Sequence, residues 1–115
     1  MVLKIKYMKT TINNLQLLNR ATNMVIKGYD LSQSLQTSAL IESLQFKLIN
    51  GTAHFIYRKT NGELREAFGT LLERVADRNI NGRGYPRKLD GLQAYFDIEE
   101  QEWRSFRYEN LITIL

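Results

Sequence analysis

The chain contains no cysteine and only one histidine, and these two shortages remove several kinds of active site. Without cysteine there is no disulfide, no thiolate ligand for a metal and no cysteine nucleophile. The single histidine, His54, cannot form a typical zinc site alone, and no G-x-S-x-G nucleophile elbow is present. We therefore expect a non-enzymatic protein that carries no catalytic residues, no metal and no cofactor.

Long apolar runs are missing as well. No segment approaches the roughly 18 consecutive apolar residues that a membrane-spanning helix needs. The N-terminus also lacks the continuous apolar stretch of a signal peptide, so we expect a cytoplasmic protein without a membrane partner. With 115 residues, 43% of them hydrophobic, the chain is long enough for one compact unit with a modest core.

The net charge of +4 is unevenly distributed. Residues 1–37 contain five basic side chains and one acidic one, whereas the remainder of the chain is neutral overall. A neutral C-terminal part argues against a broad nucleic-acid footprint there, because non-specific affinity grows with the number of phosphates neutralised. Within that part, a basic cluster and a later acidic cluster are expected to be solvated loop charges; they comprise Arg74, Arg78, Arg83, Arg87 and Lys88, and Asp97, Glu99, Glu100 and Glu102.

The first 49 residues read as a mainly helical region. Residues 2–7 alternate in polarity, which predicts a short strand or, equally, a disordered tail. Apolar residues then recur at helical spacing over residues 12–26 and again over residues 31–49. Gly28 is placed to end the first helix, and Asp30 or Ser32 to cap the second. The two helices could cap the following domain or form a dimerisation surface.

A β-hairpin follows, with strands at residues 52–59 and 63–71 around Asn61-Gly62. A two-residue turn would place Arg58 opposite Arg65. A three-residue turn with a bulge at Gly62 would instead place Lys59 opposite Glu63 and Phe55 opposite Ala67, and we favour it because it avoids the like-charge pair. In both registers Phe55 and Tyr57 share one face, which we assign to the core.

The remaining residues predict two helical turns at 72–78, a loop at 79–91 and three more strands. Residues 92–98 alternate cleanly, and a turn centred on residues 100–101 would set Ile98 opposite Trp103. That pairing would bury Trp103 and leave Tyr95, Arg104 and Phe106 on the reverse face. Residues 111–115 form the last strand. We predict an α+β fold, with two N-terminal helices (1–49) followed by a small SH3/Sm-like β-barrel of about five strands (50–115).

Two separated motifs resemble those of a known family. The segments 55–71 and 95–112 resemble an uncharacterised family of bacterial and phage proteins described as SH3 β-barrel fold-containing, the DUF2693 or WYL-like group. The wider WYL domains look similar in their last two strands, where an aromatic pair precedes an Arg-x-Phe-Arg-type ending. The matching positions in this sequence are Tyr95, Phe96, Arg104, Phe106 and Arg107. The resemblance implies a barrel that senses nucleotide or nucleic-acid ligands.

The leading functional hypothesis is a binding module for nucleic acid or a nucleotide-like ligand. Guanidinium groups grip phosphates and aromatic rings stack on bases, so the expected contacts are Arg65, Tyr95, Arg104 and Arg107, helped by a basic loop with Arg83, Arg87 and Lys88. Alternatively, Arg104 pairs with Asp97 and Arg107 with an acidic neighbour, which would leave only packing. The competing hypothesis is a protein-interaction or assembly module that acts through the helices of residues 12–49, including as a homodimer.

Overall fold

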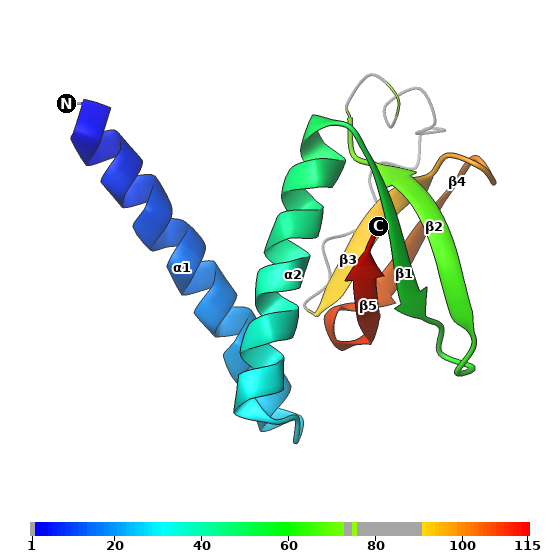
Figure 1. Ribbon diagram of the computed structural model, residues 1–115, viewed down its shortest axis with the longest axis horizontal. Helices are drawn as coiled ribbons and strands as arrows, with labels where there is room; N and C mark the ends of the chain where they lie inside the picture. Colours follow the sequence, from blue (N-terminus) through cyan, green and yellow to red (C-terminus); the bar gives the residue numbers. More distant parts are fainter. Residues whose placement is uncertain (1, 73–74, 76–90) are drawn as a thin grey trace.

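The chain folds into two helices followed by an antiparallel sheet, as a computed structural model shows (Figure 1). The structure describes residues 2–72, 75 and 91–115, and side chains within these ranges from residue 14 onward. The helices are α1 (Val2–Ile26) and α2 (Leu31–Asn50). The strands are β1 (Thr52–Arg58), β2 (Leu64–Thr70), β3 (Leu92–Asp97), β4 (Glu102–Arg107) and β5 (Leu111–Ile114), with the 3₁₀ turn η2 (Tyr108–Asn110) before β5. The strand order is β4-β3-β2-β1-β5, so the α+β fold class is confirmed.

Helix α1 begins earlier than predicted, because it includes residues 2–7. The expected strand there is therefore wrong. Six alternating residues are only weak evidence for a strand. No glycine or proline interrupts the next twenty residues, so a helix that nucleates there can extend back through residues 2–7. Gly28, with φ of +104°, follows the end of α1, and Asp30 caps α2 by accepting the N–H of Gln33 at 3.0 Å. Among the described helices, none is long and apolar enough to cross a membrane.

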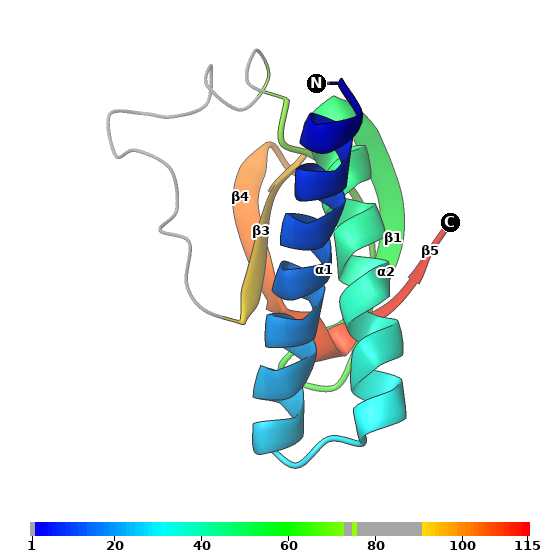
Figure 2. The ribbon, with the colours of Figure 1, turned by 90° about the vertical axis from the view of Figure 1, so that its left-hand side faces the viewer.

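The two helices pack together near the loop that joins them. Ala21 and Met24 of α1 are buried there. Arg20 donates to the hydroxyl and the carbonyl oxygen of Ser38 at 3.1 and 3.2 Å, and the Ser38 hydroxyl donates to the carbonyl of Leu17 at 2.7 Å. Farther from the loop the helices separate: the N-terminal end of α1 diverges from α2, and α2 lies between α1 and the sheet (Figures 1 and 2).

Helix α2 covers one face of the sheet and completes the core. Its residues Ile41, Leu44 and Leu48 have no exposed surface and belong to the same cluster as the sheet residues. That cluster contains a group of packed aromatic rings, which are Phe55, Tyr57, Tyr95 and Phe106. Burying several aromatic and aliphatic side chains is the main source of stability in a domain of this size.

The β1–β2 hairpin has the predicted register. Phe55 lies opposite Ala67, and the N–H of Lys59 donates to the carbonyl of Glu63 at 2.7 Å. Gly62 has φ of +90°, the left-handed conformation that the three-residue turn with a bulge requires. Phe55 and Tyr57 are both buried, so their assignment to the core is confirmed.

The β3–β4 hairpin differs from the prediction in register and in its buried face. Phe96, not Ile98, lies opposite Trp103, because the turn occupies residues 98–101 and includes Gln101 with φ of +55°. Tyr95 and Phe106 share a face as expected, but this face points into the core beneath α2 instead of away from it. Phe96 is also fully buried and packs edge-on against the half-buried Trp103, so β3 is buried on both faces.

Candidate functional site

A pocket of about 450 Å³ lies between the end of the first hairpin and strand β4. Its walls come from residues 57–60 at the end of β1, Arg65 on β2, residues 103–107 on β4, and Asn110. Strand β4 is at one end of the strand order, so within the described part of the chain it pairs with β3 alone. Five consecutive β4 residues can line the pocket for this reason, although neighbouring side chains of a strand point to opposite faces.

The lining of the pocket is strongly basic. It contains five cationic side chains and, among the residues described, no carboxylate; the cations are Arg58, Lys59, Arg65, Arg104 and Arg107. Two of them have partners within the hairpin. Arg58 donates to the carbonyl of Gly62 at 2.9 Å, and Lys59 lies 3.4 Å from Glu63.

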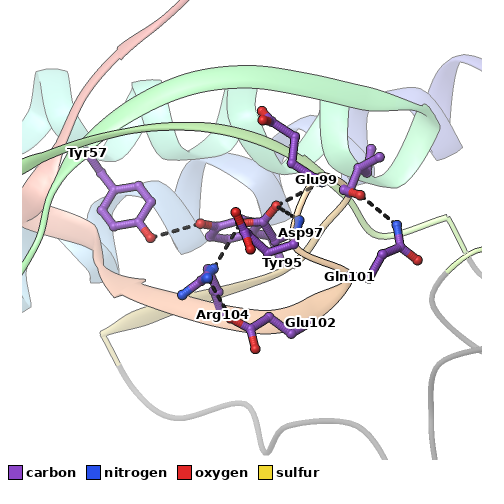
Figure 3. A network of polar contacts seen from close by, with 9 residues as sticks. Tyr57, Tyr95, Asp97, Glu99, Gln101, Glu102 and Arg104 are labelled. Atoms are coloured by element: carbon purple, nitrogen blue, oxygen red, sulfur yellow. Dashed lines mark hydrogen bonds and ion pairs between the residues drawn. The ribbon is translucent and has the colours of Figure 1, made fainter.

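Arg104 is held by two acidic side chains outside the pocket lining (Figure 3). Its Nε donates to Asp97 at 2.9 Å, and its terminal nitrogen lies 2.5 Å from Glu102. Burial disfavours the charged guanidinium, but the hydrogen bond to Asp97 and the charge of Glu102 outweigh it, so the pKa of Arg104 is raised. The expected alternative pairing of Arg104 with Asp97 is thus present, and much of this charge is neutralised within the protein.

Asp97 also organises the turn that carries Glu102. Its other carboxylate oxygen accepts the N–H groups of Glu99 and Glu100, each at 3.0 Å. Asp97 therefore positions Arg104 and closes the β3–β4 turn at the same time. The expected solvated acidic cluster is only partly solvated, because Asp97 is buried whereas Glu99, Glu100 and Glu102 are exposed.

Arg65 and Arg107 are in a different situation. Neither guanidinium group makes a hydrogen bond or ion pair with any residue that the structure describes, and the acidic neighbour foreseen for Arg107 is not found among them. Arg65 lies opposite Tyr57 in the hairpin and is half-buried, whereas Arg107 is exposed at the end of β4. Within the described part of the chain, they are the two cations of the lining whose side chains have no partner.

Tyr95, the remaining predicted site residue, lies in the core and does not line the pocket. Its hydroxyl is 2.8 Å from the hydroxyl of Tyr57, which does line the pocket (Figure 3). Burial, and then the hydrogen bond to Tyr57, raise the pKa of Tyr95 well above its ordinary value. The structure therefore brings Arg65, Arg104 and Arg107 together and connects Tyr95 to the pocket only through Tyr57.

Sequence reasoning did not select Tyr57, Arg58 or Trp103 as site residues. The predicted hairpin register contained a usable signal, since Phe55 opposite Ala67 implies Tyr57 opposite Arg65. No comparable signal connects the hairpin to β4, because these segments do not pair. The predicted basic loop with Arg83, Arg87 and Lys88, like most of the predicted helical turns at 72–78, lies outside the described residues.

Comparison with known proteins gives one result. Residues 41–112 match the family WYL_2, described as having an Sm-like SH3 beta-barrel fold, whereas no curated protein and no solved structure matches the chain. The match includes the second half of α2 and all the strands except the end of β5, and it confirms the predicted SH3/Sm-like barrel. WYL_2 is not a known enzyme family, and the narrower DUF2693 assignment stays a prediction. Since the matched residues are more than half of the sequence, the chain belongs to the WYL_2 family of Sm-like SH3 β-barrels.

Proposed function

We propose that the barrel is a non-enzymatic binding module whose basic pocket holds a phosphate-bearing ligand, either a nucleic acid or a free nucleotide. The observation that supports this most directly is the pair Arg65 and Arg107, whose guanidinium groups have no partner among the residues that the structure describes, in a lining whose described residues include no carboxylate. Guanidinium groups bind phosphate oxygens in a bidentate manner, which makes unpartnered arginines in a pocket suited to this ligand.

The rest of the lining fits the non-phosphate parts of a nucleotide. The lining includes aromatic side chains, among them the half-buried Trp103, and stacking between an aromatic ring and a base tolerates any base. Thr60, Ser105 and Asn110 add neutral hydrogen-bonding groups. A volume of about 450 Å³ falls within the range of small-ligand pockets, so one nucleotide unit of a longer strand or a free nucleotide can be accommodated.

The arginines have different roles in this proposal. Arg65 and Arg107 contact the phosphate, whereas Arg104, already neutralised by Asp97 and Glu102, shapes the wall of the pocket. Removing either of the first two should therefore weaken binding directly. Arg83, Arg87 and Lys88 are proposed to add electrostatic attraction for a longer strand.

The test is a binding titration with fluorescently labelled single-stranded DNA and RNA, followed by anisotropy at several salt concentrations. We expect Arg65→Gln and Arg107→Gln each to weaken binding by about tenfold or more, as the loss of a charge-assisted hydrogen bond predicts. Each variant should also make the slope of log affinity against log salt concentration shallower by about one, which corresponds to the loss of one phosphate contact. Lys47→Gln, which removes an exposed charge on α2 away from the pocket, is the matched control and should bind as the wild type does.

Competition with mononucleotides shows whether the ligand is a nucleic acid or a free nucleotide. If the pocket binds free nucleotides, mononucleotides should displace the labelled strand at concentrations where inorganic phosphate has little effect. If neither DNA, RNA nor nucleotides bind at low salt, the proposal is wrong. It is equally wrong if Lys47→Gln lowers the affinity as much as the two arginine variants do, because the attraction would then be unspecific.

A further inference from the structure

Helix α1 carries an apolar stripe that does not face α2. Ala21 and Met24 are buried against α2, whereas Leu15, Leu18 and Ile26 are 58%, 52% and 77% exposed. At 100° per residue these exposed positions centre on the side of the helix opposite the buried ones. Helix α2 lies between α1 and the sheet (Figures 1 and 2), and the exposed side chains of this stripe are covered neither by α2 nor by another described element.

This stripe follows a heptad repeat over three heptads of the sequence. Spacings of three and four residues alternate without interruption from residue 5 to residue 26, as in a coiled-coil seam. In the sequence, the a positions of this repeat are Ile5, Ile12, Asn19 and Ile26, and the d positions are Met8, Leu15 and Thr22. A globular amphipathic helix needs only the stripe that packs on its neighbour, so a second stripe at heptad spacing, apolar at five of its seven positions, favours pairing with another helix.

We propose that α1 forms a parallel two-stranded coiled coil with α1 of a second copy of this chain. Isoleucine occupies three of the four a positions, and methionine or leucine two of the three d positions, the third being Thr22. β-branched residues at a with leucine-like residues at d favour two parallel strands, and a single asparagine at an a position favours the same state. Asn19 also determines the orientation. In a parallel pair it faces its own copy and the two amides can hydrogen-bond, whereas in an antiparallel pair it would face a d residue such as Met8.

The residues that flank the seam are compatible with self-association. In a parallel pair, residues at g approach residues at e of the partner's next heptad, and most of these are uncharged here: Thr11 with Gln16, and Leu18 with Asn23. Lys4 and Lys9 form the single like-charge pair in the register. Salt screens that repulsion, so dimerisation should strengthen as salt rises, the opposite of the response expected for nucleic-acid binding.

The experiment is a mass measurement of the full chain by light scattering after gel filtration, without ligand. The wild type should have twice the 13.4 kDa mass of one chain. Leu15→Glu combined with Ile26→Glu should give a monomer, and circular dichroism should show a folded protein because both side chains are exposed. Leu64→Glu, which changes an equally exposed leucine on β2, is the matched control and should stay dimeric. A monomeric wild type at high micromolar concentration, or a dimeric double variant, would overturn the proposal.

Orientation is tested by a cysteine, because the natural chain has none. Thr22→Cys places one thiol at a d position, where two parallel helices bring their copies within disulfide distance. Under mild oxidation it should give a covalent dimer, whereas Leu64→Cys should not. A dimer that Thr22→Cys fails to cross-link would contradict the parallel arrangement. None of these measurements depends on ligand binding, so they leave the proposed function of the pocket untouched.

Discussion

Two buried phenols share one hydrogen bond beneath the basic pocket. Tyr57 and Tyr95 come from strands that do not pair, and their hydroxyls lie 2.8 Å apart. The pKa of Tyr95 is raised mainly because the ring is buried and then because of this bond, while the positive charge of Arg65 acts in the opposite direction. Folded and unfolded chains therefore bind the Tyr95 proton with different strength, which makes stability depend on pH.

Replacing Tyr95 by phenylalanine should flatten the alkaline end of the stability profile. In the wild type the folded pKa exceeds the unfolded value of about 10, so the contribution is complete below pH 10 and is lost progressively above it. Above pH 10 the contribution of Tyr95 to the free energy of unfolding should fall by about 1.4 kcal/mol per pH unit. Urea denaturation at neutral and alkaline pH measures this slope.

Tyr95→Phe should show a shallower slope than the wild type, together with a loss of about 1 kcal/mol at neutral pH from the missing hydrogen bond. Tyr29→Phe, at an exposed position in the loop before α2, is the control and should keep the wild-type slope. An unchanged slope in Tyr95→Phe would show that this proton is not the one that couples to folding.

Gly69 on β2 is the position where the core has least room for a side chain. A Cβ atom there would lie 2.5 Å from Cδ2 of Tyr95 and 3.3 Å from Cε1 of Phe55. Both are ring atoms in a fully packed cluster, so the rings would have to shift. We expect Gly69→Ala to lower the free energy of unfolding by about 1–3 kcal/mol, the usual cost of overpacking. Urea denaturation measures it.

Gly51→Ala is the matched control for this substitution. Gly51 has extended φ of 170°, and an added Cβ would approach nothing closer than the carbonyl oxygen of Lys47 at 4.0 Å. This variant should be nearly as stable as the wild type. Equal stability of the Gly69 and Gly51 variants would mean that the Tyr95 ring moves aside at little cost.

At the scale of elements, the start of α2 depends on one side chain. The sequence offered Asp30 and Ser32 as caps, and in the structure the Asp30 carboxylate accepts the N–H of Gln33. A carboxylate at this position also interacts favourably with the positive end of the helix dipole. Asp30→Ala should therefore cost about 1 kcal/mol of stability. Ser32→Ala should cost almost nothing, and thermal unfolding of the two variants compares them directly.

The two hairpins show which elements could be predicted and why. The turn at Asn61-Gly62 could be predicted because Gly62 readily adopts positive φ. The alternative register would have placed Arg58 opposite Arg65, and this like-charge pair argued against it. The β3–β4 turn contains no such residue: Gln101 adopts positive φ without being glycine, and Asp97 closes the turn through its side chain. Alternation grouped Tyr95 with Phe106 correctly, but only the position of α2 decides which face is buried.

At the scale of the whole molecule, the fold was more predictable than the site. The signals that predicted the fold are local: helical periodicity, a strong turn and alternating strands each involve only a few neighbouring residues. They can therefore be recognised in the sequence alone. The pocket instead joins the end of β1 to β4, about 45 residues later, through the curvature of the sheet. Three of its arginines were foreseen by their residue type, yet their different states depend on Asp97 and Glu102, whose positions follow from the register of β3 and β4.

The two proposals combine in one prediction about the length of nucleic acid that the protein prefers. In a parallel coiled coil the two-fold axis runs along the helices, so the two barrels lie at the same level along this axis. A strand that reaches both pockets binds the second one intramolecularly, which raises the overall affinity by a factor of about 10²–10⁴. A strand of about 8 nucleotides, close to the site size of one small barrel, can reach only one pocket and lacks this advantage. A strand of about 40 nucleotides can reach both.

We therefore expect the wild type to bind the longer strand at least about a hundredfold more tightly than the shorter one. Leu15→Glu combined with Ile26→Glu should bind both lengths with nearly the affinity that the wild type has for the short strand, because its pocket is intact and only the pairing of chains is lost. Leu64→Glu should keep the wild-type preference for length, although its carboxylate lies opposite Arg58 of the pocket and should lower the affinity for both strands. Anisotropy titrations of both strands with the three proteins measure the ratio, and a double variant that retains the full preference for length would mean that one chain alone binds along the strand.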